Sequence, residues 1–196
     1  IREIIPEAAT QKVTAWDLGM SDSTAIWVAE MISGEVRVMD FYEASGESLD
    51  HYIKWLDEKG YRDYTHIMPH DVNVRELQTG KSRYQFLTEA GLDIEVAPKS
   101  SVEDGIQAVR RILPNCWFNK DKTRAGVECL QNYRRVFNEK TSSFQNRPLH
   151  DWSSHAADAF RYLALGMDST GNGQRTDWSK PFETTLDGDS YKDYYV

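Results

Sequence analysis

The sequence predicts an α/β domain whose mixed β-sheet combines an antiparallel meander with parallel strands and is flanked by helices. Short apolar runs typical of β-strands fill residues 12–18, 24–32 and 35–42, and the last of them has a two-residue alternation of apolar and polar side chains. Strand-like and helix-like segments then alternate to about residue 166, an order typical of parallel strands joined by helices. With 196 residues, 40% of them hydrophobic, the chain is long enough for one domain with extensions.

The first three strands are expected at residues 12–18, 24–32 and 35–42. The third alternates regularly between apolar and polar side chains, and Ser33–Gly34 supplies the turn before it. Such short connections favour antiparallel pairing, with the first strand at the centre of the sheet.

A helix is then expected from Ser48, a good capping residue, to about Lys59, with Gly60 as its stop. A fourth strand should occupy Thr65 to Met68. The remaining elements are expected as helices near residues 82–90, 102–113, 124–138 and 153–166, with a short strand at residues 94–97.

The chain is expected to divide into three parts. Residues 1–11 are predicted to be an N-terminal extension or linker cut from a longer protein, residues 12–167 the folded domain, and residues 168–196 a flexible tail rich in Asp, Ser, Thr and Gly. No run approaches the length of a membrane span and no signal peptide is evident. Cys116 and Cys129 are too few and too far apart for a zinc site or a disulfide framework, so the cytoplasm fits best.

The charge is unevenly distributed. The formal net charge is −8, which argues against a simple basic nucleic-acid-binding protein, yet residues 61–166 carry two more Lys and Arg than Asp and Glu. Basic side chains in this middle region are candidates for phosphate contacts. A set of solvated faces explains the same charges, and composition does not separate the two interpretations.

Three acidic residues occupy positions that should reach the core. Asp17 and Asp71 each follow a short apolar run, and Asp158 lies on a helix that is otherwise apolar. A carboxylate leaves water at a large cost unless a cation or several donors receive it. Hard oxygen ligands then predict a site for Mg²⁺ or Mn²⁺ rather than zinc.

Four segments carry a resemblance to a known family, and in chain order they are Asp17–Thr24, Pro69–Asp71 with Arg75–Arg83, Pro98–Ile106 and Pro148–Tyr162. Together they resemble the C-terminal nuclease domain of tailed-bacteriophage terminase large subunits, over roughly residues 12–166. The resemblance implies a ribonuclease H-like fold and an endonuclease that cuts concatemeric double-stranded viral DNA during packaging. It places the three family acids on Asp17, Asp71 and Asp158.

The same resemblance implies cofactors and partners. Phosphodiester hydrolysis by two metal ions needs a bridging acid, for which Asp17 is the candidate, while Asp71 and Asp158 each hold one Mg²⁺ or Mn²⁺ ion. Asp22 is either an outer ligand or a turn residue that bonds its own backbone. The expected partners are double-stranded DNA, an N-terminal ATPase domain of the same protein, the terminase small subunit and the portal, in the host cytoplasm.

Two further residues near the last helix are possible accessory groups. Asp151, His155 and Asp158 share a helix face only if the helix begins early enough, whereas Ser153 as the N-cap leaves Asp151 outside. His155 either helps to position DNA or water, or bonds a backbone carbonyl.

One loop is a candidate DNA contact. Gly80-Lys81-Ser82 resembles the end of a phosphate-binding loop, but Arg75 occupies the required upstream glycine position and no strand leads into it, which excludes nucleotide binding there. Arg75, Lys81 and Arg83 on this loop, together with Lys122, are instead predicted to contact DNA phosphates.

Two competing interpretations belong to other classes. Asp17-Leu18-Gly19 also resembles the first phosphate loop of phosphotransferases of the actin and sugar-kinase superfamily, but the second glycine-rich loop and the duplicated domain are missing. A non-catalytic DNA-clamping or motor-docking module would keep the fold and lose cleavage. The distinction between this module and a nuclease depends on whether the three acids bind metal.

Overall fold

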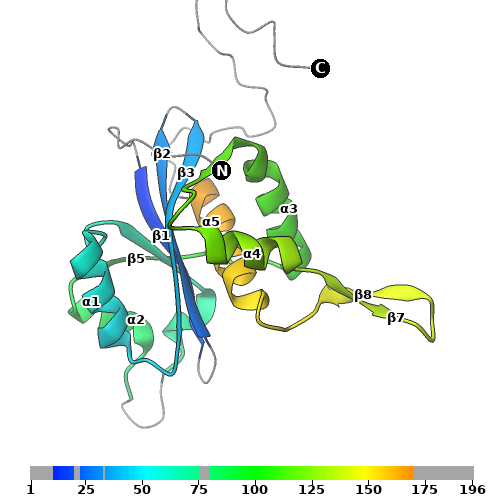
Figure 1. The fold of residues 1–196 in the computed structure, drawn as a ribbon. Coiled ribbons are helices and arrows are strands. Elements are labelled where there is room, and N and C mark those ends of the chain that lie inside the picture. The colour runs from blue at the N-terminus through cyan, green and yellow to red at the C-terminus, as the bar shows by residue number, and fades with distance from the viewer. Residues whose placement is uncertain (1–10, 20–22, 33, 76–79, 170–196) are drawn as a thin grey trace, which may run out of the picture.

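The computed structural model describes residues 11–19, 23–32, 34–75 and 80–169, and within them a six-stranded sheet has the order β5-β4-β1-β2-β3-β6 (Figure 1). Its strands are β1 (Gln11–Asp17), β2 (Ser23–Ile32), β3 (Glu35–Ser45), β4 (Thr65–Met68), β5 (Asp93–Val96) and β6 (Cys116–Phe118). β1, β2 and β3 form the antiparallel meander, and β4, β5 and β6 join it in parallel. The predicted mixed sheet is confirmed, with β1 in its interior.

Helices cover both faces of this sheet (Figure 1). α1 (Leu49–Lys59) and α2 (Arg83–Glu89) lie on one side, and α3 (Val102–Ile112), α4 (Arg124–Asn132) and α5 (Ser154–Ser169) lie on the other. Short 3₁₀ turns follow β4 at His70–Asn73 and α3 at Leu113–Asn115. None of the helices in the described ranges is long and apolar enough to span a membrane.

The helix boundaries follow from local chemistry. Gly60 ends α1 with a positive φ of 74°, a conformation that glycine adopts without strain. Ser82 begins α2 with a capping box, in which its hydroxyl accepts from the Gln85 backbone N–H and the Gln85 side chain accepts from the Ser82 N–H. Ser101 begins α3 by accepting from the Asp104 backbone N–H.

The predicted helix over residues 124–138 is wrong in its second half. α4 ends at Asn132, and β7 (Arg135–Asn138) pairs antiparallel with β8 (Ser143–Pro148) to form a hairpin that projects from the body (Figure 1). Val136 is β-branched and Phe137 is aromatic, and such residues favour strands when a partner strand is available. The short strand β6 is also missing from the sequence-based prediction, and α5 continues two residues beyond the expected domain boundary at 167.

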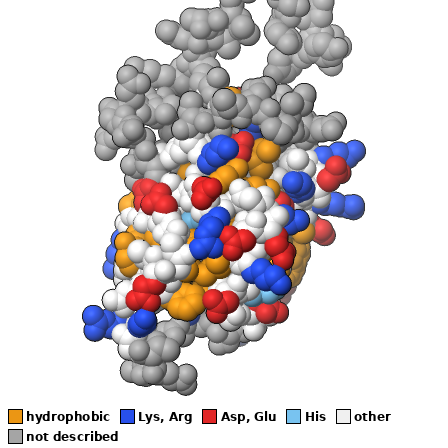
Figure 2. Space-filling view, turned by 90° about the vertical axis from the view of Figure 1, so that its left-hand side faces the viewer, with side chains coloured by type: hydrophobic (Ala, Val, Ile, Leu, Met, Phe, Trp, Pro, Cys, Tyr) orange, Lys and Arg blue, Asp and Glu red, His pale blue; other side chains and the backbone are white. Residues whose placement is uncertain are grey.

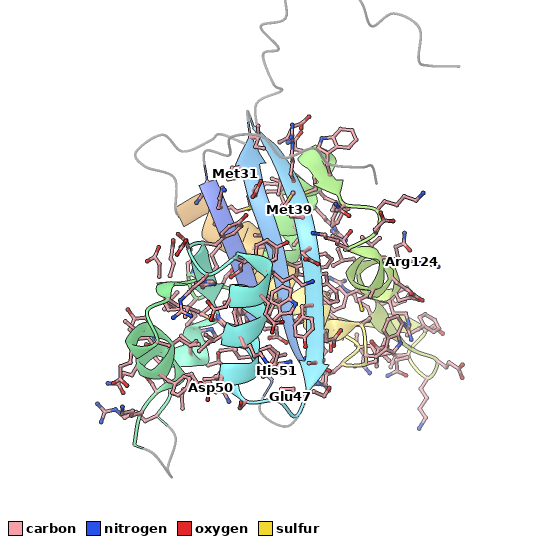
Figure 3. The ribbon with its side chains drawn as sticks, turned by 60° about the vertical axis from the view of Figure 1, so that its left-hand side comes forward. Met31, Met39, Glu47, Asp50, His51 and Arg124 are labelled. Atoms are coloured by element: carbon pink, nitrogen blue, oxygen red, sulfur yellow. The ribbon has the colours of Figure 1, made fainter. Side chains whose placement is uncertain are left out.

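The core has two parts, one on each side of the sheet. On the α1 side it is aromatic, with Trp16, Tyr52 and Trp55 among its buried side chains. Figure 3 looks onto this side, with α1 in front of the sheet and Glu47, Asp50 and His51 near the start of the helix. His51 bonds Tyr42 at 2.6 Å and lies 3.5 Å from Glu47, which joins α1 to β3.

Candidate functional site

The strand period places Asp17 on the α5 side of the sheet. Val13 and Ala15, four and two residues earlier on β1, are buried in the core beneath α5, while Thr14 and Trp16 point the other way. Asp17 is the last residue of β1, so its carboxylate lies at the strand end that faces α5.

Small side chains let α5 lie close to this strand. Ala156 and Ala159 are fully buried on the helix, and the Trp27 indole of β2 donates to the Ala156 carbonyl at 2.7 Å. A Cβ on Gly166 would lie 2.6 Å from the Ile67 side chain of β4, so glycine is needed at this contact. The close approach brings the polar residues of α5 to the end of β1.

His155 is the direct link between the helix and the strand. Its Nδ1 lies 3.0 Å from the Asp17 Oδ2, and since a carboxylate accepts, the Nδ1–H donates. Burial raises the pKa of Asp17 above its ordinary value, the His155 hydrogen bond opposes this shift, and the negative charge of Asp158 adds to it. Asp17 is therefore a desolvated carboxylate with a second acid nearby, which is an environment that favours a bound cation.

Asp158 is fixed by two other side chains through one of its oxygens. Arg161 donates to Oδ1 from Nε at 3.2 Å and lies 2.8 Å away through its second nitrogen, Nη2. The Tyr133 hydroxyl donates to the same atom at 3.3 Å. Tyr133 follows α4, so three separate segments of the chain meet at the site.

The pKa of the Tyr162 phenol is affected by the charges of all three predicted acids. Burial raises the pKa of its phenol to about 12, Arg161 opposes this shift, and the charges of Asp17, Asp158 and Asp71 add to it. Asp71 is exposed in the 3₁₀ turn after β4. The fold thus brings all three acids within electrostatic range of one phenol.

The donor set has the chemistry of a site for a hard cation. Asp17 uses Oδ2 for His155, and Asp158 uses Oδ1 for Tyr133 and Arg161, so the second oxygen of each is available. Carboxylate oxygens are the ligands that Mg²⁺ and Mn²⁺ prefer. Across residues 11–19, 23–32, 34–75 and 80–169, however, no three His, Cys, Asp or Glu side chains converge closely enough to hold an ion. A complete site therefore needs a ligand beyond Asp17 and Asp158.

The other predicted site residues are placed differently. Asp22 lies outside the described residues. Asp151 precedes α5 and accepts from the Ser153 backbone and hydroxyl at 3.0 and 2.6 Å, with Arg134 at 3.4 Å, so it closes the turn before the helix. Of the two arrangements open from the sequence, the structure has the one in which Asp151 stands outside the helix.

The four basic candidates do not form one cluster. Lys81 pairs with Glu89 at 2.7 Å, Arg83 reaches the Leu18 carbonyl at 3.5 Å, and Arg75 bridges to Ser82. Lys122 belongs instead to the turn before α4, on the opposite side of the sheet. Figure 2 shows the α1 and α2 side, where acidic and basic side chains are interspersed.

Three side chains at the site are absent from the sequence-based prediction: Tyr133, Arg161 and Tyr162. Arg161 and Tyr162 follow Asp158 by three and four residues, a spacing that places them on its helix face. Both could therefore have been predicted as neighbours of Asp158 from the sequence. Tyr133 lies 25 residues before Asp158 and carries no such signal.

No protein-family model and no curated protein matches the chain by sequence. Solved structures do match its fold. The nuclease domain of the bacteriophage P22 large terminase has a TM-score of 0.63 and 17% identity, over 85% of this chain and 86% of that domain. The nuclease domain of the bacteriophage SPP1 large terminase, with bound Mn, has a TM-score of 0.56 and 16% identity, over 78% and 84%.

The chain has the fold of a terminase nuclease domain. A large terminase from a thermophilic bacteriophage gives the same fold, with a TM-score of 0.63 and 16% identity over 83% of this chain. The chain spans 41% of the length of that protein. The predicted ribonuclease H-like α/β class is thereby confirmed.

Proposed function

We propose that this chain is the metal-dependent endonuclease domain of a viral DNA-packaging terminase, and that it cuts concatemeric double-stranded DNA by hydrolysing phosphodiester bonds. The observation that carries the proposal is the desolvated Asp17 carboxylate, hydrogen-bonded to His155 and coupled to Asp158, in the fold of the terminase nuclease domains. The bound Mn in the SPP1 nuclease domain supports a divalent cation at such a site.

Each residue has a distinct part in this proposal. Asp17, Asp158 and Asp71 would hold the ions through their carboxylate oxygens. His155 keeps the Asp17 carboxylate oriented, and Tyr133 with Arg161 orients Asp158. A pair of Mg²⁺ or Mn²⁺ ions, when bound, makes a water acidic enough to attack phosphorus and stabilises the leaving oxygen. Asp22 or a DNA phosphate completes the ligand set.

The partners are those that the family resemblance implies. We propose an N-terminal ATPase domain in the same protein, with the terminase small subunit and the portal as further partners in the host cytoplasm. The large terminase of the thermophilic bacteriophage, which is more than twice as long as the matched region and has been solved in complex with ADP, supports the ATPase domain. Phosphates of duplex DNA are the proposed contacts of Arg75, Lys81, Arg83 and Lys122. The separation of Lys122 from the other three implies a long DNA path across the domain.

The test is cleavage of supercoiled plasmid by the purified chain with Mn²⁺, Mg²⁺ or EDTA. We expect nicking and linearisation with either ion, none with EDTA, and a fall in rate of more than about 100-fold for Asp17→Asn or Asp158→Asn, since each change removes a ligand charge without changing volume. Asp63→Asn is the matched control, because Asp63 is exposed and lies outside the site. Its rate should equal that of the parent.

The same assay distinguishes the proposed nuclease from a non-catalytic DNA-binding module. A DNA-clamping module would bind plasmid in a gel-shift experiment and leave it intact at every metal concentration. Full activity of the Asp158→Asn protein would instead exclude the proposed three-acid site.

A further inference from the structure

Arg161 is a buried cation directly beside the proposed metal ligands. Only 7% of its surface is exposed, and its guanidinium approaches a single oxygen of Asp158 through two nitrogens. A guanidinium usually pairs with both oxygens of a carboxylate in a fork. Here both contacts are made to Oδ1, so the guanidinium does not occupy Oδ2.

The surroundings of Arg161 are shaped to hold it. A Cβ on Gly105 of α3 would lie 3.2 Å from both Cδ and Nη1 of Arg161, so glycine leaves the space that the side chain occupies. The guanidinium carbon also lies 5.6 Å from the centre of the Tyr162 ring. A buried charge needs such compensation, because it has lost its water.

The charge of Arg161 reaches beyond its partner. It acts on Asp17, where it opposes the effect of Asp158, and on Tyr162, where it opposes the three acids together. Arg161 is thus a permanent positive charge that faces the whole acidic site.

We propose that Arg161 is the resident counter-cation of the site: it neutralises and orients Asp158 in the metal-free protein, and a divalent ion binds against its charge. This inference rests on the proposed function, because it takes Asp158 as a metal ligand. Arg161 is accordingly a positioning residue, and its presence lowers metal affinity while it keeps the empty site folded.

The experiment measures Mn²⁺ affinity rather than cleavage. The dissociation constant is determined by calorimetry and by the electron paramagnetic resonance of free Mn²⁺ at pH 8, for the full chain and for Arg161→Met and Arg161→Lys. We expect Arg161→Met to bind Mn²⁺ about tenfold more tightly, because a nearby like charge is removed. The same variant should have a lower Tm without metal and a larger rise of Tm with it. Arg161→Lys, which keeps the charge, should stay within about twofold of the parent in affinity.

Arg134→Met is the matched control. Arg134 pairs with Asp151 at 3.4 Å outside the site, so this variant has the same change of net charge and should bind Mn²⁺ as the parent does. Equal or weaker binding by Arg161→Met, in a protein whose parent binds Mn²⁺, would overturn the counter-cation role alone. Failure of the parent to bind Mn²⁺ would overturn the proposed function as well.

A measurement on the parent covers the case in which Arg161→Met does not fold. The Nε–H of Arg161 donates to Asp158 at 3.2 Å, so its nitrogen-15 resonance reports on this bond. As Mg²⁺ is added, the chemical shift of that resonance should change in proportion to the fraction of protein that has bound the ion. A resonance that stays fixed at saturating Mg²⁺ would show that the ion binds independently of Arg161, and the inference would fail.

Discussion

The two faces of the sheet are packed differently. Beneath α1 and α2 the core is built from large rings, with Trp16 edge-on to Tyr52 at 6.0 Å and Trp55 stacked on Tyr42 at 4.7 Å. Beneath α5 the core also contains rings, among them Trp27 and Phe160 with centroids 5.2 Å apart, but small residues of the helix lie at its closest contacts with the sheet. Large rings bury the most apolar area per residue, while small residues allow the closest approach of backbones. We call the α1 side the aromatic face and the α5 side the alanine face, because small side chains on the latter set the distance between α5 and Asp17.

Removal of a large side chain from the aromatic face should have the largest effect on stability and none on the site. Leu56 of α1 is fully buried, and Leu56→Ala should lower the free energy of unfolding by about 2–5 kcal/mol through lost burial and a cavity. Chemical denaturation measures the loss. Mn²⁺ affinity, measured at a temperature where the variant is folded, should not change. A weaker affinity would show that the two faces are coupled.

Metal binding should stabilise the protein through the alanine face, and a substitution at Asp17 should remove this stabilisation. An ion that binds only the folded site adds about 2.7 kcal/mol at 100 times its dissociation constant. Burial raises the pKa of Asp17, so the ionised carboxylate lowers the free energy of unfolding at neutral pH. This loss diminishes as the pH falls through the raised pKa and the carboxyl group becomes protonated. Asp17→Asn should consequently have a higher Tm than the parent without metal and gain less from Mn²⁺. An equal rise of Tm in both proteins would place the ions elsewhere.

A single methyl group on the alanine face should disturb both stability and the site. A Cβ on Gly166 would lie 2.6 Å from Ile67, so Gly166→Ala should destabilise the protein by about 1–3 kcal/mol and weaken Mn²⁺ binding as α5 moves from the sheet. Val36→Ala in β3 is the control. Val36 is fully buried in the same core but lies at the strand end away from Asp17, so the variant should lose comparable stability and keep its metal affinity. Loss of affinity in both variants would mean that the whole face positions the ligands.

The sequence predicts the parts of this comparison that rest on local patterns. The apolar run before Asp17 is correctly read as a strand, and Ser48, Gly60 and Ser82 are correctly read as helix boundaries, because both signals depend on neighbouring residues. The hairpin of β7 and β8 is not predicted, because Arg135–Asn138 follows a helix and its pairing partner lies across a turn with a positive φ at Ser142. The resemblance of four segments to terminase nuclease domains predicts Asp158 as a site residue, and this role stays a prediction. The bond between Asp158 and Tyr133 depends on packing that no spacing reveals.

The smallest expected effect is a change in the pH dependence of stability, and it comes from a buried histidine on the aromatic face. The His66 Nδ1 accepts from the Thr14 hydroxyl at 2.7 Å and its Nε2–H donates to the Arg62 carbonyl at 3.1 Å. Burial lowers the pKa of His66 below its ordinary value of 6.5, while the Arg62 carbonyl and Asp93 oppose this shift.

Since the folded form prefers neutral His66, its contribution to stability is complete above pH 6.5 and is lost as the pH falls toward the lowered pKa. One proton changes the free energy of unfolding by at most about 1.4 kcal/mol per pH unit. His66→Gln keeps a polar side chain that does not titrate, so its denaturation midpoint should fall less than that of the parent between pH 7 and about pH 5. Parallel curves for the two proteins would assign the acid sensitivity to the carboxylates of the other face.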